Sequence, residues 1–220
     1  MTIPSTTQPM RVLFAGGGTG GHVMPGAAIA HALEELRPGT RSLFLTTGRE
    51  AEKHCHRALA PFEVTEVPAA RWAGGIQKAR FSITSIAAAC RSVDVFRFFR
   101  PDAVVGLGGY GCMAPLVVAR GMALPTMVLE SNAIPGRVVR LLAPLVDCVQ
   151  LQWEEAARHL RARHTIVTGN PIRPHMFGAN RHEALRRLGL SGGRITLLVM
   201  GGSQGALSIN RALDAAFQRL

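Results

Sequence analysis

The sequence predicts an α/β protein built on a doubly wound parallel β-sheet with helices on both faces. Three observations indicate this class. Segments with the composition of strands and of helices alternate along the chain. The strand segments are short and apolar, as in a sheet buried on both faces, and several of them run directly into glycine-rich loops. Right-handed strand–helix–strand crossovers give a doubly wound sheet. Ligands of such sheets bind at the carboxyl ends of the strands.

The elements follow in a regular order. The first strand is expected at Arg11–Ala15, and the helix after it at Ala27–Leu36. Six more strands are expected at Ser42–Thr47, Phe62–Val67, Ala103–Leu107, Thr126–Glu130, Cys148–Leu151 and Thr165–Thr168. Helices are expected between them near residues 49–59, 81–99, 112–120, 136–143 and 154–162, with turns at Pro101, Pro125 and the Arg37–Gly39 corner.

The polar stretch Asn170–Asn180 indicates a domain boundary. A short helix is expected at His182–Leu188, then a strand at Arg194–Met200 that leads into a glycine loop and a helix to Leu220. One strand and one helix cannot bury both faces of a second α/β domain, which usually needs ~100 residues or more. We therefore expect a complete Rossmann-like domain at residues 1–170, a linker at 171–190 and the start of a truncated second domain at 191–220.

The charge predicts anionic partners. The formal net charge is +11 and the pI is about 11.2, and arginine supplies all the positive side chains except Lys53 and Lys78. Aromatic residues make up only 5% of the chain, with a single tyrosine, so base-stacking platforms for nucleic acid are not expected. A membrane surface or a pyrophosphate is the preferred partner.

Neither a metal site, a disulfide nor a membrane span is expected. The four cysteines (Cys55, Cys90, Cys112 and Cys148) are widely spaced, with no C-x-x-C pair. We therefore expect reduced thiols, as in a cytosolic protein. The adjacent residues His54, Cys55 and His56 would point about 100° apart on a helix and could not close on one ion. The longest apolar stretch, Met113–Leu129, is interrupted by Arg120, and the first ten residues lack the features of a signal peptide.

The glycine loop Gly16–Gly21 lies between the first strand and its helix, where bare backbone N–H groups suit a phosphate. Its spacing also fits a dinucleotide-binding fingerprint. That alternative needs an acidic residue about 20 residues on, at the tip of the second strand. The second strand ends instead in Thr46-Thr47-Gly48, and Glu50 falls in the next helix, which disfavours an NAD-dependent enzyme.

Four further loops come after strands: GLGGYG at 106–111, ESN at 130–132, GNPIR at 169–173 and GGSQG at 201–205. With the first loop, they closely resemble the MurG family of peptidoglycan glycosyltransferases over about residues 11–215. The resemblance implies the GT-B fold, in which two Rossmann-like domains face each other across a cleft. It also implies transfer of GlcNAc from UDP-GlcNAc to the MurNAc C4 hydroxyl of lipid I, giving lipid II with inversion and without a metal or cofactor.

The resemblance assigns roles residue by residue. Thr19, Gly20 and Gly21 match the loop that contacts the donor sugar or the acceptor pyrophosphate. His22 is the expected acid–base or orienting residue, although it could simply cap the loop. Glu130 is the rival general base.

Other positions match substrate contacts of the family. Asn132 matches an asparagine of the donor-sugar site, Arg173 an arginine on the nucleotide-sugar phosphates, and Ser203 a hydroxyl at the donor α-phosphate. Tyr110 is expected either to support the acceptor or to pack within its loop.

The family contacts the cytoplasmic face of the inner membrane as a peripheral protein, through an apolar patch with basic neighbours. Trp72, Ile76 and Phe81, flanked by arginine and lysine, supply that composition here; the alternative is that they belong to the core.

Three departures from the family matter. Leu129 and Ser131 stand where the family usually has histidine and glutamine on either side of the glutamate. The acceptor loop at Ala70–Ala73 lacks the Gly-Leu-Arg-like sequence that is usual in the family. The second domain, which holds most donor contacts, is expected to be missing beyond its first unit, so the chain alone is not expected to turn over. The alternative is a non-catalytic, membrane-anchoring subunit whose separate partner chain supplies that domain. The short piece of second domain argues against it.

Overall fold

The computed structural model describes residues 9–17, 20–48, 55–69, 77–173, 176–178, 180–201 and 205–218, with only the backbone for residues 56, 57 and 77–81. The chain divides into two compact units, Met1–Arg173 and Pro174–Leu220. The first unit carries the whole sheet, and with it four of the five strand-end loops at which a ligand is expected.

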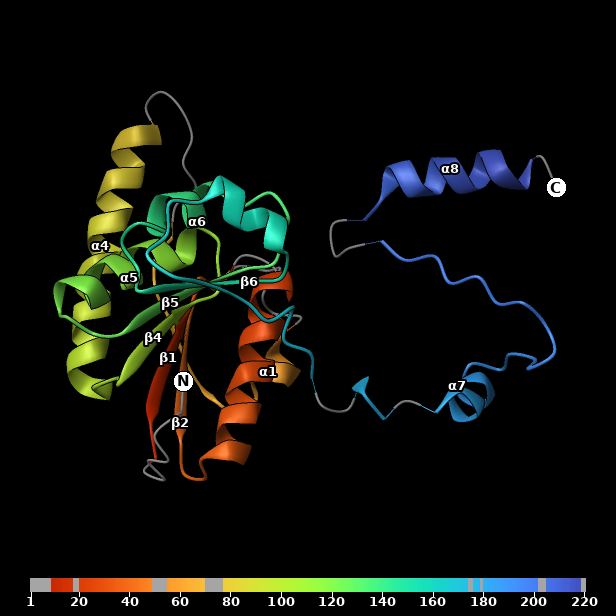
Figure 1. Ribbon diagram of the computed structural model, residues 1–220, viewed down its shortest axis with the longest axis horizontal. Helices are drawn as coiled ribbons and strands as arrows, with labels where there is room; N and C mark the ends of the chain where they lie inside the picture. Colours follow the sequence, from red (N-terminus) through yellow and green to blue (C-terminus); the bar gives the residue numbers. More distant parts are fainter. Residues whose placement is uncertain are drawn as a thin grey trace. The chain divides into compact units, whose positions relative to one another are not determined.

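The sheet of the first unit has seven parallel strands in the order β3-β2-β1-β4-β5-β6-β7 (Figure 1). The strands are β1 (Arg11–Ala15), β2 (Arg41–Thr46), β3 (Glu63–Glu66), β4 (Ala103–Gly106), β5 (Thr126–Glu130), β6 (Cys148–Leu151) and β7 (Thr165–Val167). All seven strands predicted for this unit are confirmed to within two residues. The direction of winding reverses between β1 and β4, so this is the point where a doubly wound sheet opens a crevice for ligands.

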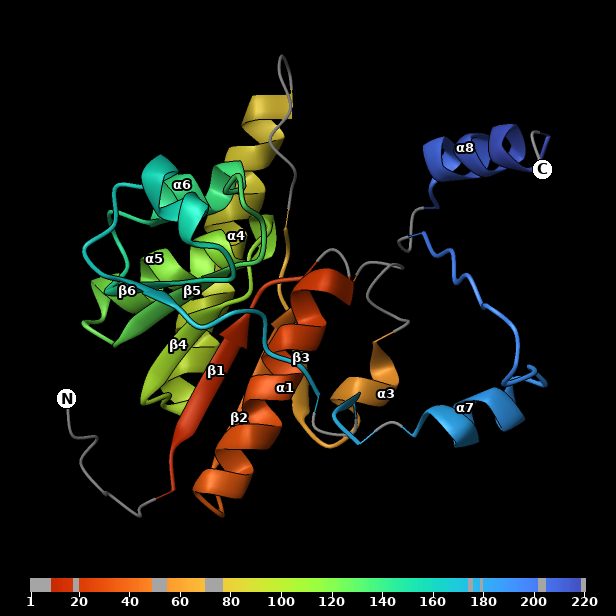
Figure 2. The same ribbon diagram turned by 45° about the vertical axis from the view of Figure 1, so that its right-hand side comes forward.

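Helices cover both faces of the sheet (Figure 2). They are α1 (Gly20–Leu36), α3 (His56–Leu59), α4 (Gln77–Phe99), α5 (Met113–Gly121) and α6 (Arg137–Leu142), with 3-10 turns η1 (Tyr110–Cys112) and η2 (Glu154–His159). Successive residues of β1 point to opposite faces. Val12 and Phe14 pack with α1, while Leu13 and Ala15 pack with α4, α5 and α6, so each face has its own apolar core.

Helix α1 begins at Gly20, seven residues before the predicted start at Ala27. The buried Val23, Ala27 and Ala30 lie on one helix face and extend the apolar stripe back into the glycine loop. Pro25 lies near the helix start, where it removes no more than one intrahelical hydrogen bond. This earlier start places His22 in the first turn of the helix rather than in a loop.

The second unit contains α7 (Arg181–Arg187) and α8 (Leu207–Phe217). Helix α7 is capped by Asn180, whose side-chain oxygen accepts hydrogen bonds from the backbone N–H groups of His182 and Glu183. The strand predicted at Arg194–Met200 is wrong: this segment has no regular structure. A strand needs a hydrogen-bonded neighbour, and the described part of this unit offers none, leaving Ile195 fully exposed.

None of the helices in the described part of the chain is both long enough and apolar enough to span a bilayer.

Leu116 tests the packing between α5 and the sheet. It is fully buried, and its Cδ1 lies 2.5 Å from where a Cβ at Gly106 would stand. We expect Leu116→Ala to lower the free energy of unfolding by about 2–5 kcal/mol, because it leaves a cavity against β4. The neighbouring Val117→Ala, at a position 49% exposed, is the control and should cost less than about 1 kcal/mol. Equal losses in urea denaturation would contradict this packing.

Candidate functional site

The loops after β1 and β4 touch through glycine backbones at the point where the winding reverses. A Cβ at Gly16 would lie 2.8 Å from the Gly108 carbonyl oxygen, and one at Gly109 would lie 2.8 Å from that of Gly17. Gly16, Gly108 and Gly109 all have positive φ angles (137°, 89° and 69°). Any other residue at these positions would be strained. A Cβ at Gly16 or Gly109 would also push the two loops apart, and one at Gly108 would meet the ring of His22.

His22 projects from the first turn of α1 onto this glycine contact. Its Cδ2 lies 2.9 Å from where a Cβ at Gly108 would stand, and its Cε1 lies 3.8 Å from the corresponding position at Gly109. The imidazole is half-buried. The glycines of the β4 loop, which carry no side chains, are therefore what makes room for the ring.

Cys112 reinforces the β4 loop. Its Sγ donates a hydrogen bond to the Gly109 carbonyl oxygen at 3.2 Å. Complete burial raises the pKa of this thiol to about 12, although backbone hydrogen bonds oppose the rise. The group therefore stays protonated at neutral pH and acts as a donor within the loop, not as a nucleophile.

Glu130, at the end of β5, holds the next loop closed. Its side chain is 3% exposed. Oε1 accepts hydrogen bonds from the Asn132 backbone N–H at 2.8 Å and from Asn132 Nδ2 at 2.7 Å, and Oε2 accepts one from the Gly136 N–H at 2.7 Å. The carboxylate thus fixes the loop between β5 and α6 and orients the Asn132 amide.

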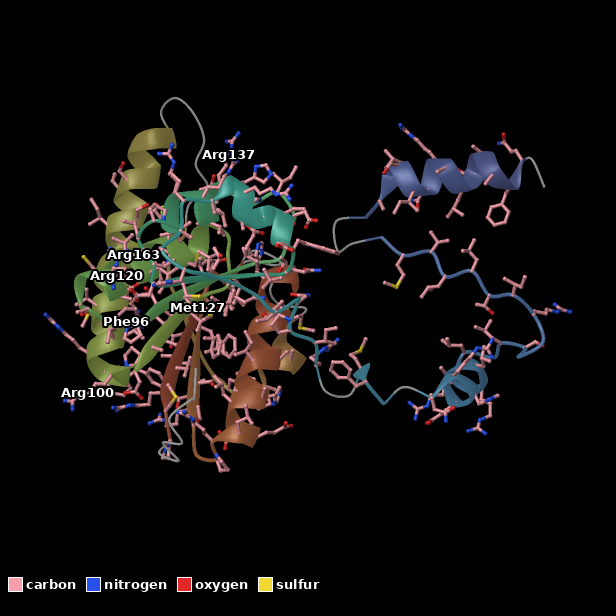
Figure 3. The ribbon with its side chains drawn as sticks, in the orientation of Figure 1. Phe96, Arg100, Arg120, Met127, Arg137 and Arg163 are labelled. Atoms are coloured by element: carbon pink, nitrogen blue, oxygen red, sulfur yellow. The ribbon has the colours of Figure 1, made fainter. Side chains whose placement is uncertain are left out.

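The first turn of α1 and the loops after β4 and β5 line a pocket of about 490 Å³ at the carboxyl ends of these strands. His22, Tyr110, Glu130 and Asn132, which the sequence singled out, all line it together with Gly21. Arg137, in the first turn of α6, also lines it, and Figure 3 places this arginine at the α6 edge of the unit. Arg137 was not predicted from the sequence, although a cation at the helix start after the ESN loop was a signal for it.

The GNPIR segment is anchored separately. Gln150, buried on β6, donates through Nε2 to Thr168 Oγ1 at 2.7 Å and to the Gly169 carbonyl oxygen at 2.6 Å. Ser131 Oγ lies 3.4 Å from Asn170 Oδ1 and joins this segment to the β5 loop. Arg173, at the end of the segment, is not among the described residues that line the pocket.

Several predicted site residues lie outside the described residues: Thr19, Trp72, Ile76 and Ser203. Phe81 is described only by its backbone, within α4. Gly20 is the first residue of α1, and a Cβ there would lie 3.3 Å from Cys55 Sγ. Among the described residues, no three histidine, cysteine or acidic side chains gather as they would around a metal ion.

An acidic side chain does reach the tip of β2, where the sequence predicted none. It comes from the neighbouring strand: Glu66 Oε2 lies 2.6 Å from where a Cβ at Gly48 would stand. Spacing along the chain could not reveal this approach. The choice between a dinucleotide and a sugar substrate therefore needs evidence other than this one position.

Fold and site together define a Rossmann-like protein whose crevice, at the reversal of a doubly wound sheet, suits a phosphorylated ligand. The profile described as "Glycosyltransferase family 28 N-terminal domain" matches residues 12–151. The chain belongs to glycosyltransferase family 28.

Curated relatives agree with the resemblance to MurG seen in the loops. Proteins of Pelobacter propionicus and Desulforudis audaxviator are 35% and 38% identical to the chain over 96% and 95% of its length. Both are named UDP-N-acetylglucosamine–N-acetylmuramyl-(pentapeptide) pyrophosphoryl-undecaprenol N-acetylglucosamine transferase. The chain spans 60% and 57% of their lengths.

Solved structures show the same fold. MurG of Acinetobacter baumannii superposes with a TM-score of 0.69 at 24% identity, covering 96% of this chain and 58% of that one. A UDP-GlcNAc 2-epimerase of Neisseria meningitidis, solved with UDP-GlcNAc, superposes with a TM-score of 0.54 at 17% identity over 73% of this chain and 46% of its own.

Glu130→Gln tests the loop contact. A glutamine amide has one acceptor oxygen and one NH₂ group, so it cannot accept from both Asn132 and Gly136, and one buried N–H must face another donor. We expect a loss of about 1–3 kcal/mol in the free energy of unfolding, together with a shift of the Asn132 side-chain amide resonances. The control is Glu154→Gln, at an exposed position on η2. If both variants unfold like the parent protein, the three hydrogen bonds do not hold the loop.

Proposed function

We propose that this chain is the acceptor-binding part of a transferase that moves GlcNAc from UDP-GlcNAc to the MurNAc C4 hydroxyl of lipid I, forming lipid II with inversion. One observation carries the proposal. A single pocket combines a histidine, an amide and an arginine with the glycine-rich start of α1. Backbone N–H groups and a guanidinium favour pyrophosphate, and imidazole can take up a proton near neutral pH. The names of the curated relatives supply the sugar and the lipid.

In the proposed reaction the MurNAc hydroxyl oxygen attacks the anomeric carbon of the donor from the side opposite the UDP. The new C–O bond forms as the bond to the UDP oxygen breaks, and UDP leaves as an anion. His22 accepts the hydroxyl proton, because its imidazole lines the pocket and lies against Gly108 and Gly109. The bare N–H groups near Gly21 stabilise the acceptor pyrophosphate.

Glu130 has a different proposed role from the general base that the sequence also allowed. Its two oxygens already accept three hydrogen bonds, and the side chain is 3% exposed. A carboxylate held in this way supports the loop that presents Asn132 to the sugar. We therefore assign proton removal to His22 and positioning to Glu130.

The remaining family residues take their roles by resemblance. Thr19 and Gly20 would extend the backbone cradle around the phosphates, and Tyr110 would form one wall of the acceptor site. Arg173 and Ser203 would contact the donor phosphates.

Trp72, Ile76 and Phe81 are the proposed membrane contact, at the cytoplasmic face of the inner membrane. The net charge of +11 supports this placement, because it favours approach to anionic lipid.

Calorimetric titration of the chain with a short-chain, pyrophosphate-linked MurNAc analogue tests the proposal, with NAD as the competing ligand. We expect the analogue to bind and NAD not to bind. Arg137→Ala should weaken binding about tenfold, the equivalent of ~1.4 kcal/mol, by removing a charge-assisted contact. Arg140→Ala is the matched control: it lies one turn further along α6 and does not line the pocket. Binding of NAD without binding of the analogue would overturn the proposal.

A further inference from the structure

A second cavity adjoins the polar pocket. It is a groove of about 250 Å³ between α4 and α5, at the same edge of the sheet as the pocket. One helix face of α4 forms one wall and the first two turns of α5 form the other. The lining residues of the two helices are Thr84, Ser85, Ile86, Ala88 and Ala89 on α4, and Met113, Ala114 and Val117 on α5.

Alanines on the facing helices create the space. Ala88 and Ala89 on α4 and Ala114 on α5 all line the groove, where longer side chains would fill it. None of the described residues that line it is charged. The apolar surface continues outward on both helices, because Ile86 is 64% exposed and Val117 is 49% exposed. The groove is therefore suited to a slender hydrocarbon and not to a charged group.

Tyr110 connects the two cavities. This residue lines both the groove and the pocket that holds His22, Asn132 and Arg137. Both cavities belong to the first compact unit, so their relation is fixed by one fold. A ligand that spans them must have an anionic head for the pocket and an apolar chain for the groove.

We propose that the groove between α4 and α5 binds the first isoprene units of a polyprenyl pyrophosphate acceptor while its pyrophosphate lies in the polar pocket. This inference rests on the proposed function, since the lipid-linked acceptor comes from there. It adds a binding site on the protein for part of the lipid chain itself, separate from any contact with the bilayer. One water molecule occupies about 30 Å³ in the liquid. If each methyl or methylene group takes the same volume, the groove of about 250 Å³ holds about eight of them. That is between one and two isoprene units.

A series of soluble probes tests the groove without a membrane. Inorganic pyrophosphate, isopentenyl, geranyl and farnesyl pyrophosphate carry zero, one, two and three isoprene units on a pyrophosphate group, and the three esters carry the same charge. We expect affinity in calorimetric titration to rise at least about tenfold from pyrophosphate to geranyl pyrophosphate, because apolar surface is buried. It should change little from geranyl to farnesyl pyrophosphate, because the groove is then full.

Ala89→Phe should abolish this dependence on chain length by filling the groove, leaving all four probes within about threefold of one another. Ala87→Phe is the matched control: it makes the same change at an exposed position of α4, two residues away, that does not line the groove. Ala114→Phe repeats the test from the α5 wall, and circular dichroism confirms that each variant is folded.

The outcomes separate this inference from the proposed function. If pyrophosphate binds and the series is flat, the groove does not hold isoprene and the pocket proposal stands. If affinity rises with chain length equally in Ala89→Phe and Ala87→Phe, the chain binds elsewhere and the inference is wrong. If only binding to lipid vesicles responds to Ala89→Phe, the groove contacts the bilayer instead of a single isoprenoid chain. If none of the probes binds, both the groove and the anion pocket are wrong.

Discussion

The close contact between the loops after β1 and β4 is the constraint on which the rest of the site depends. Three positions there, Gly16, Gly108 and Gly109, have positive φ angles, and two carbonyl oxygens lie where side chains would otherwise begin. The first turn of α1, which begins at Gly20, carries His22 against Gly108 beside this contact. The crevice is thus built from backbone, which suits a ligand recognised mainly by its phosphates.

Strand β5 positions the other side chains of the pocket, and a carboxylate forms hydrogen bonds at each end of this strand. At its start, Asp147 accepts hydrogen bonds from the N–H and the hydroxyl of Thr126 and pairs with Arg120. Partial burial acts to raise the pKa of Asp147, but the Thr126 hydrogen bonds and the charge of Arg120 outweigh it and leave the pKa lowered. At its end, Glu130 organises the loop to α6. Asn132 and Arg137 therefore have defined positions relative to His22.

The sequence predicted most of the first unit because its signals were local. Short apolar runs indicated the strands, and glycine loops at the carboxyl ends marked the crevice. Three features required the folded chain. The start of α1 depended on burial of Val23 against the sheet, which overrode the glycine composition. The hydrogen bonds that the Glu130 carboxylate accepts come from N–H groups two and six residues further along the chain. The approach of Glu66 to Gly48 brought the end of β3 to the loop after β2. In the second unit, Arg194–Met200 has the composition of a strand but no partner in the described residues, so composition alone was misleading there.

The central claim is that the crevice between the β1, β4 and β5 loops binds the pyrophosphate of a lipid-linked sugar. Amide chemical shifts of the ¹⁵N-labelled chain, measured while a soluble pyrophosphate-linked MurNAc analogue is added, test this claim most directly. We predict that the largest shifts fall at Gly21, His22, Gly108–Tyr110 and Asn132, where backbone N–H groups and the loop held by Glu130 line the pocket. Shifts confined to Pro174–Leu220, or to the far edge of the sheet at β7, would contradict it.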